Sequence, residues 1–199
     1  MVRRRRDEMI EETRGKLIAA GRRAFAAKGY AAASMDELTA EVGLTRGALY
    51  HNFGDKKGLL RAVIERMDVE MSARLREVAD RAETPWLGLI DESIAYIEMA
   101  LEPEIQRIVL LDGPAVLGDP SGWPGQNTCL VATTRTIQAL IDSGTVHPVD
   151  AEAAARLVNG AALNAALWVA ASDDPPAVLA RAVEAFRCLV SGLLRKGRE

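Results

Sequence analysis

The segment of residues 34–57 carries the signals for two short helices joined by a tight turn, and it constrains the fold more than any other part of the chain. Ser34 and Glu37 have the spacing of a capping box, which predicts a helix that begins directly after Ser34. Gly43 follows where the chain has to turn, because glycine adopts positive φ without a steric penalty. Thr45 can then cap a second helix. The pattern predicts a helix-turn-helix.

The second of these helices is too polar to serve only as core. Leu49 is expected to point inward and Phe53 to close the end of the helix, which leaves several polar side chains facing outward. Asp55 can cap a third helix that carries Lys56 and Lys57 in its first turn. Cations in this position oppose the helix dipole, and they are better explained if a phosphate binds there. A DNA-reading module is therefore expected.

This segment resembles the TetR-like transcriptional regulators. The resemblance rests on the ordered residues F25, KGY30, SMDEL38, VGLTRGALYHNF53 and DKKGLL60, and it covers about the first third of the chain. Thr39 is a departure, because the family commonly has alanine there. The resemblance implies that Thr45, Arg46 and Gly47 lie at the major groove and that Tyr50, His51 and Lys56 contact phosphates. The full set of candidate DNA-binding residues is Ser34, Thr45, Arg46, Gly47, Tyr50, His51 and Lys56.

The distribution of charge agrees with DNA binding, although the net charge of −3 by itself does not. Residues 1–60 contain 12 Lys and Arg against 8 Asp and Glu, whereas the other 139 residues contain 13 against 20. Basic charge is therefore concentrated in the helix-turn-helix segment. The run Arg3–Arg6 has two readings: a disordered arm that reaches the DNA backbone or minor groove, or a solvated tail.

The composition predicts an all-α protein. Alanine-rich segments, few aromatic residues and no alternating β-branched runs favour helices over strands. No apolar run approaches the roughly 18 residues of a membrane span, and no secretory signal precedes the basic run, so we expect a cytoplasmic protein without a membrane partner. Cys129 and Cys188 lack metal-ligand spacing and suit a reducing compartment.

Proline, glycine and capping residues divide the chain into two domains, which we place at residues 1–54, a helix-turn-helix DNA-binding domain, and residues 55–199, a helical ligand-binding and dimerisation domain. Between residues 112 and 127 the chain is too rich in Gly and Pro for a regular element. Helices are expected at about residues 55–82, 84–101, 103–112, 126–142, 150–171 and 175–195.

The last two helices are the expected surface of a homodimer. The final helix is apolar over a wider face than one buried stripe requires, and its neighbour carries small residues that allow close approach. Two helices from each subunit would form a four-helix arrangement, which also supplies the two recognition helices that a two-half-site operator needs. Ordinary core within one chain is the alternative for some of these positions. The candidate interface residues are Leu157, Ala161, Phe186, Leu189, Val190 and Leu193.

A pocket for a small apolar or amphipathic effector is expected among the middle helices, where apolar residues are interspersed with a few polar ones. Trp123 lies in the Gly- and Pro-rich segment and could form a lid over the pocket or a plug in the partner subunit. For each residue an ordinary core or surface role is the alternative. The candidate ligand-binding residues are Trp86, Tyr96, Val109, Trp123, Gln138, Asn164 and Trp168.

Enzymatic chemistry is not indicated. The chain has two histidines and lacks a metal-ligand cluster, a phosphate-binding loop, a dinucleotide fingerprint and a nucleophile elbow, so we expect no catalytic residue, metal or cofactor. Asp112 beside Gly113 is explained by the end of a helix. The sequence favours a ligand-responsive transcriptional repressor that binds an operator in double-stranded DNA. The alternative is a helical adaptor that binds another protein instead of DNA.

Overall fold

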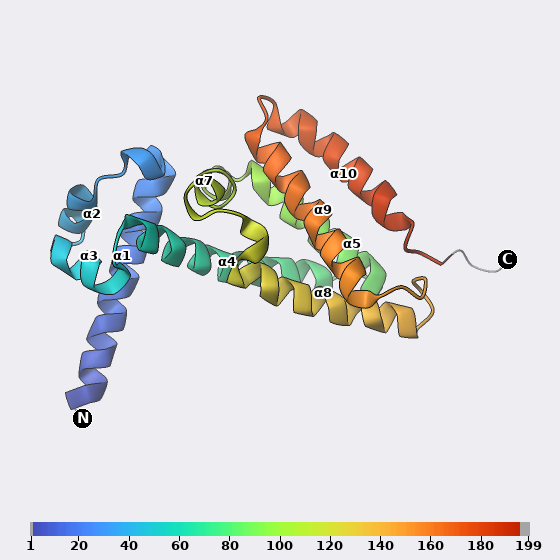
Figure 1. Ribbon diagram of the computed structural model, residues 1–199, viewed down its shortest axis with the longest axis horizontal. Coiled ribbons are helices and arrows are strands. Elements are labelled where there is room, and N and C mark those ends of the chain that lie inside the picture. The colour runs from blue at the N-terminus through green and yellow to red at the C-terminus, as the bar shows by residue number, and fades with distance from the viewer. Residues whose placement is uncertain (1, 196–199) are drawn as a thin grey trace.

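The computed structural model describes residues 2–195, with side chains from Glu8 onward, and within this range the regular elements are helices. Helices α1 (Val2–Ala32), α2 (Met35–Glu41) and α3 (Arg46–Phe53) form a small module at one end of the molecule. Helix α4 (Lys56–Asp80) leads from this module into a larger helical body (Figure 1). The all-α prediction is confirmed. The side chains of Arg3–Arg6 lie outside the described part, although their backbone continues α1.

The predicted capping residues start their helices as expected. The Ser34 hydroxyl accepts from the backbone N–H of Glu37 at 3.4 Å, and that of Thr45 accepts from Ala48 N at 3.2 Å. The Asp55 carboxylate accepts from the N–H of the residue three positions later, Gly58, at 2.6 Å. Each side chain satisfies a donor that the helix itself leaves unpaired, which is why these residues fix the three starts.

Gly29 ends the regular part of α1. Its φ of 75° and ψ of 165° break the helical conformation, although one further turn of chain follows to Ala32. A Cβ atom at this position would lie 3.1 Å from Nε of Arg107, so the guanidinium of another helix occupies the space that a side chain would need. The positive φ favours glycine here, and a side chain would also require the Arg107 guanidinium to move by a few tenths of an ångström.

The larger body consists of α4, α5 (Pro85–Glu98), α8 (Pro124–Asp142), α9 (Ala151–Ala171) and α10 (Pro175–Ser191). Helix α9 packs against α5 and α8 on one side and against α10 on the other, so α10 forms an outer layer (Figure 1). The core includes Val63, Ile97, Ile137, Val158 and Phe186, which are all buried. None of the described helices is both long enough and apolar enough to cross a lipid bilayer.

An irregular segment joins α5 to α8. It contains η1 (Met99–Leu101), α6 (Pro103–Ile105), η2 (Gln106–Asp112), α7 (Gly113–Leu117) and η3 (Pro120–Gly122). The predicted single helix over residues 103–112 is only partly correct, because η2 is π-helical. Residues 113–117 were expected to be irregular and instead form a short α-helix, since Pro114 lies in its first turn and Gly118, at φ 91°, ends it.

The C-terminal segment leaves the helical conformation earlier than predicted. Helix α10 ends at Ser191, and Val146 forms an isolated antiparallel bridge with Leu194. The N–H of His147 donates to the carbonyl of Leu193 at 2.9 Å, and that of Arg195 donates to Thr145 at 3.0 Å. These backbone hydrogen bonds replace the last helical turn because the α8–α9 loop lies beside it.

Candidate nucleic-acid interface and ligand pockets

Helix α3 has the two faces that a recognition helix requires. Leu49 is fully buried and packs in the same core as Phe25 and Leu38, which fixes the helix on α1 and α2. The opposite face is exposed to solvent. It carries the predicted residues Thr45, Arg46, Gly47, Tyr50 and His51.

Arg46 and Tyr50 form one polar unit on this face. The guanidinium of Arg46 donates to the Tyr50 hydroxyl at 3.1 Å, lies 5.4 Å from the centre of its ring, and forms an ion pair with Asp36 at 3.4 Å. The hydrogen bond to Tyr50 and the charge of Asp36 raise the pKa of Arg46. The pair is held over the exposed face, where a planar guanidinium can reach a base edge or a phosphate.

Lys56 is less accessible than the sequence suggests. Its ammonium donates to the carbonyl of Ala31 at 3.2 Å and lies 4.7 Å above the centre of the Tyr30 ring. Burial lowers the pKa of Lys56, and the negative charge of Asp112 acts in the opposite direction. Lys57 is exposed. The hydrogen bond to the carbonyl of Ala31 thus explains the presence of a lysine at position 56 without a bound phosphate. Lys57 is the more accessible cation of the pair.

Polar contacts join the module of α1, α2 and α3, which we call the DNA-reading module after its expected role, to the larger body. The backbone N–H of Tyr30 donates to Oδ2 of Asp112 at 2.7 Å. The guanidinium of Arg22 donates to both carboxylate oxygens of Glu104, at 2.8 and 2.7 Å, and to Glu70 at 2.6 Å. The hydrogen bond to Glu104 is the largest effect on the pKa of Arg22 and raises it. Burial is the next largest effect and lowers this pKa, but the net shift is upward. We call these five residues the interdomain contact.

Sequence reasoning missed the interdomain contact. It explained Asp112 by the end of a helix, whereas the carboxylate crosses to the end of α1. The partners lie far apart in the chain, so no local pattern identifies them. The only available signal was Gly29 followed by Tyr30, which marks an interrupted helix end with an unpaired N–H.

A small cavity lies among α4, α5, α8 and α9, with a volume of about 50 Å³. We call it the central cavity. It has room for little more than one water molecule. The polar residues on its wall are Glu92, Ser93, Tyr96, Gln126, Cys129, Thr133 and Asn159. Burial raises the pKa of Glu92, and burial followed by the charge of Asp68 raises that of Tyr96.

Tyr96 is the one predicted ligand-binding residue that lines the central cavity. Trp123 lines a different pocket, of about 220 Å³, between α4 and the start of α8. Val109 is buried in the core and Trp86 packs against it. These two side chains therefore serve the packing of the body.

Three predicted ligand-binding residues lie outside both of these pockets. Gln138 is exposed and donates to Asp142 at 2.8 Å. Asn164 is exposed on the wall of a groove between α9 and α10. Trp168 is 45% exposed, and the guanidinium of Arg181 lies 5.5 Å from the centre of its ring. Helical periodicity does not reveal which face of α8 or α9 the neighbouring helices cover, so it does not place these side chains relative to the pockets, and their contact with a ligand stays a prediction.

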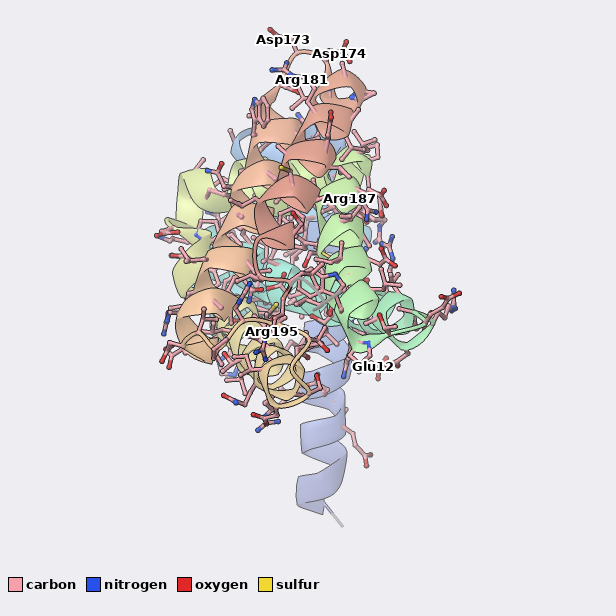
Figure 2. The ribbon with its side chains drawn as sticks, turned by 90° about the vertical axis from the view of Figure 1, so that its right-hand side faces the viewer. Glu12, Asp173, Asp174, Arg181, Arg187 and Arg195 are labelled. Atoms are coloured by element: carbon pink, nitrogen blue, oxygen red, sulfur yellow. The ribbon has the colours of Figure 1, made fainter. Side chains whose placement is uncertain are left out.

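The groove between α9 and α10 has a volume of about 520 Å³ and a mainly apolar lining. Helices α9 and α10 lie on the face turned toward the viewer in Figure 2, where Arg181 and Arg187 mark the course of α10. Leu157 and Leu189 on the walls of the groove are 75% and 66% exposed. The predicted interface residues Ala161, Val190 and Leu193 also line this groove.

Phe186 is a correction to the predicted interface. Its side chain is only 3% exposed and belongs to the core of the same chain, so it is not available to a partner. Val190 is similarly buried at 4%, although it forms the floor of the groove. The inner side of α10 is therefore covered by its own chain, and the outer side is not.

A metal centre was not expected, and among the side chains that the structure describes no group of three or more His, Cys, Asp and Glu residues is placed to hold a metal ion.

Comparison with known proteins places these features in a family. Residues 17–63 match "Bacterial regulatory proteins, tetR family", and residues 86–193 match "Tetracyclin repressor-like, C-terminal domain". The crystal structure of a TetR-family transcriptional regulator from Pectobacterium atrosepticum is 50% identical, with a TM-score of 0.89, over 96% of this chain and 98% of that one.

Two curated relatives match the chain less extensively. The HTH-type transcriptional regulator TtgR of Pseudomonas putida is 30% identical over 110 residues, which are 54% of this chain and 52% of that protein. The HTH-type transcriptional repressor AcnR of Corynebacterium glutamicum is 30% identical over 102 residues, or 50% and 52% of the two chains. The match thus spans about half the length of these relatives. Matches to both domains, and to a whole solved chain, show that this protein belongs to the tetR family of bacterial regulatory proteins.

Proposed function

We propose that this protein is a homodimeric transcriptional repressor that binds an operator in double-stranded DNA and is released from it by a small molecule. The observation that carries the DNA-binding part is the exposed face of α3, where the Arg46–Tyr50 pair is held above the fully buried Leu49. A helix anchored on one side and polar on the other fits the major groove, which is about 12 Å wide. The match of residues 17–63 to the family supports the same assignment.

The contacts have separate roles in this proposal. Thr45, Arg46 and Gly47 at the start of α3 approach base edges, while Tyr50 and His51 approach phosphates. Lys57 adds an exposed cation at the start of α4. The ammonium of Lys56 either donates to a phosphate while it keeps its hydrogen bond to the carbonyl of Ala31 or leaves that carbonyl for the phosphate. The Ser34 hydroxyl accepts from Glu37 N as the cap of α2, and its own O–H can still donate to a phosphate. Phosphate contacts position the protein, and base contacts provide specificity.

Dimerisation rests on the α9–α10 groove. Leu157 and Leu189 are largely exposed on its walls, and small residues such as Ala161 allow a second helix to come close. A symmetric interface would cover this apolar surface and would give the two recognition helices that an inverted-repeat operator requires. The relative AcnR is a transcriptional repressor by name, which supports the repressor assignment here, and the name of TtgR supports a transcriptional regulator.

An effector would bind in the larger body, where the central cavity and the pocket beside Trp123 lie. It would lower operator affinity only if it binds the DNA-free conformation more tightly than the DNA-bound one. The interdomain contact is the route by which a change in the body reaches the DNA-reading module.

Selection of operator sequences from random double-stranded DNA tests the proposal. The wild-type protein should enrich an inverted repeat whose half-sites lie about one helical turn apart. Arg46→Ala should lose this enrichment, whereas Arg76→Ala, which changes an exposed arginine far from α3 on α4, should keep it. If the wild-type protein enriches no sequence and shows no salt-sensitive affinity for DNA, the adaptor hypothesis replaces the repressor hypothesis.

A further inference from the structure

The pocket beside Trp123 is larger than the central cavity. It has a volume of about 220 Å³ and lies between α4 and the segment that leads into α8; we call it the α4–α8 pocket. Ile64, Leu117 and Trp123 form apolar parts of its wall, and Asp68 supplies a carboxylate. This volume accommodates a small organic molecule, although it is below the usual range for drug-sized ligands.

Asp68 is a largely buried carboxylate without a protein partner. Within residues 8–195 no hydrogen bond or ion pair reaches it, in contrast to Glu70 two positions later, which pairs with Arg22. Burial, with a smaller contribution from the charge of Glu65, raises the pKa of Asp68 to about 6. Among the described residues, every fully buried side-chain oxygen has a hydrogen-bond partner. Because Asp68 has none, its carboxylate oxygens are not fully enclosed, and they face the pocket that Asp68 lines.

The first turn of α8 closes over this carboxylate. A Cβ atom at Gly125 would lie 2.6 Å from Oδ2 of Asp68, so this position brings the backbone against the acid and leaves no space for a side chain. The helix N-cap, Trp123, makes no side-chain capping hydrogen bond. The carboxylate is thus held in place by packing and not by a counter-ion.

The charge of the pocket favours a cationic ligand. Asp68 and Glu65 are acidic, and Arg61 at the exposed rim is the one basic residue on the described wall. A desolvated carboxylate is stabilised by an opposite charge brought within a few ångströms. The indole of Trp123 can contribute a further attraction, because aromatic faces bind ammonium groups.

The pocket is in contact with the segment that carries the interdomain contact. Cη2 of Trp123 lies 2.7 Å from the position that a Cβ atom on Gly113 would occupy. Gly113 directly follows Asp112, whose carboxylate accepts from the N–H of Tyr30. A ligand that displaced the Trp123 ring would therefore act on the backbone next to Asp112.

We propose that the α4–α8 pocket binds a small organic cation, an ammonium group with an apolar substituent, which pairs with Asp68, lies against Trp123 and acts on the Asp112–Tyr30 contact. The binding site stands on its own geometry. Its effect on DNA rests on the proposed function of the protein. The proposal names the chemical class of the effector and assigns it to this pocket and not to the central cavity.

Calorimetry with benzylamine, and with benzyl alcohol as its uncharged counterpart, tests the binding site at pH 7.5. Benzylamine should bind at least tenfold more tightly than the alcohol. Asp68→Asn should remove this preference, and Glu65→Gln, a change of an exposed acid on the same wall, should reduce it less than threefold. A second variant, Trp123→Leu, should weaken amine binding while Asp68 remains. Equal binding of the two compounds, or an unchanged preference in Asp68→Asn, would overturn the assignment.

Operator binding in the presence of benzylamine tests the coupling separately. Asp68→Asn should bind DNA like the wild type without the amine, because Asp68 lies outside the DNA-reading module, and should lose the amine response. Amine binding that depends on Asp68 but leaves operator affinity unchanged would overturn the coupling and keep the site. Failure of the wild type to bind DNA at all would reject the proposed repressor function, while the calorimetric result would still decide the site.

Discussion

The backbone N–H of Tyr30 and Oδ2 of Asp112 are 2.7 Å apart, although 82 positions separate the two residues in the chain. Tyr30 stands near the end of α1, immediately before the helix-turn-helix formed by α2 and α3, and Asp112 ends the π-helical turn η2. One hydrogen bond therefore ties the base of the helix-turn-helix to the part of the body that lies beside the α4–α8 pocket. Single-turn π-helical insertions are frequent at functional sites, and this one positions Asp112.

Removal of the Asp112 acceptor should loosen the DNA-reading module. Asp112→Ala leaves the partly buried Tyr30 N–H without a partner, which costs about 1–3 kcal/mol of stability. Asp112→Asn retains an oxygen acceptor at this position and should cost less. Urea unfolding measures both values, and anisotropy on the selected operator should show weaker binding for the alanine variant. Equal stability of the alanine and asparagine variants would indicate that solvent replaces the hydrogen bond.

Arg46 and Tyr50 should have different effects on DNA recognition. Arg46→Ala is expected to relax discrimination at one base position by about 1–3 kcal/mol, since it removes a side chain that can bind a base edge. Tyr50→Phe removes the hydroxyl that accepts from Arg46 at 3.1 Å and should weaken binding across sequences with a smaller loss of discrimination. Competition between operator variants measures both effects. The same specificity profile in all three proteins would argue against base contact by Arg46.

The two lysines at the start of α4 should differ in their contribution to salt dependence. Lys57 is exposed, so Lys57→Gln should reduce the slope of log K against log salt by about one unit, the value expected for one phosphate contact. The ammonium of Lys56 already bonds to Ala31 O at 3.2 Å. Lys56→Gln should therefore also lower the melting temperature in the absence of DNA, which Lys57→Gln should not do. Identical behaviour of the two variants in both measurements would contradict this distinction.

Stability should depend on the titration of Asp68. Its pKa is about 6 in the folded protein and 3.8 in the reference state, so the folded state binds the proton more tightly. The contribution of Asp68 to the free energy of unfolding is therefore largest below pH 4, where the carboxyl is protonated in both states, and it is lost as the pH rises through 6. At pH 7.5 Asp68→Asn should be more stable than the wild type by an amount on the order of 1–3 kcal/mol. The difference should disappear near pH 4. Urea titrations at both pH values measure it, and a less stable variant at pH 7.5 would show that an unseen partner stabilises the carboxylate.

The dimer can be tested without damage to the fold of one chain. Leu189 is 66% exposed on the groove, so Leu189→Arg should leave the helical content unchanged and shift sedimentation to a monomer, with loss of operator binding. Val69→Arg, a change of another exposed apolar residue at 63% exposure on α4, serves as the control and should remain dimeric. Phe186→Arg is unsuitable, because it would place a charge in the core. A wild-type monomer at micromolar concentration would refute the dimer.

The sequence alone determined the helix starts and the identity of the recognition helix. Three helices begin at a capping residue whose side-chain oxygen accepts from the N–H three residues later: Ser34, Thr45 and Asp55. Because such a contact depends only on nearby residues, the sequence predicts it. Leu49 is the apolar residue between polar neighbours in α3, and it is fully buried. Because a short helix that packs on two other helices buries one side, the position of Leu49 also identifies the exposed side of α3. The boundary between residues 54 and 55 as a domain division stays a prediction.

The tertiary structure decided which faces of the later helices are available. Phe186 and Leu189 lie on one amphipathic helix, yet the first is buried in its own chain and the second is exposed. Periodicity identifies an apolar surface but not the element that covers it, because coverage depends on how distant segments pack. The same reason explains why Trp168 and Gln138 lie outside the pockets. The Tyr30–Asp112 hydrogen bond and the unpaired carboxylate of Asp68 arise only when segments far apart in the chain come together, so no local pattern could predict them.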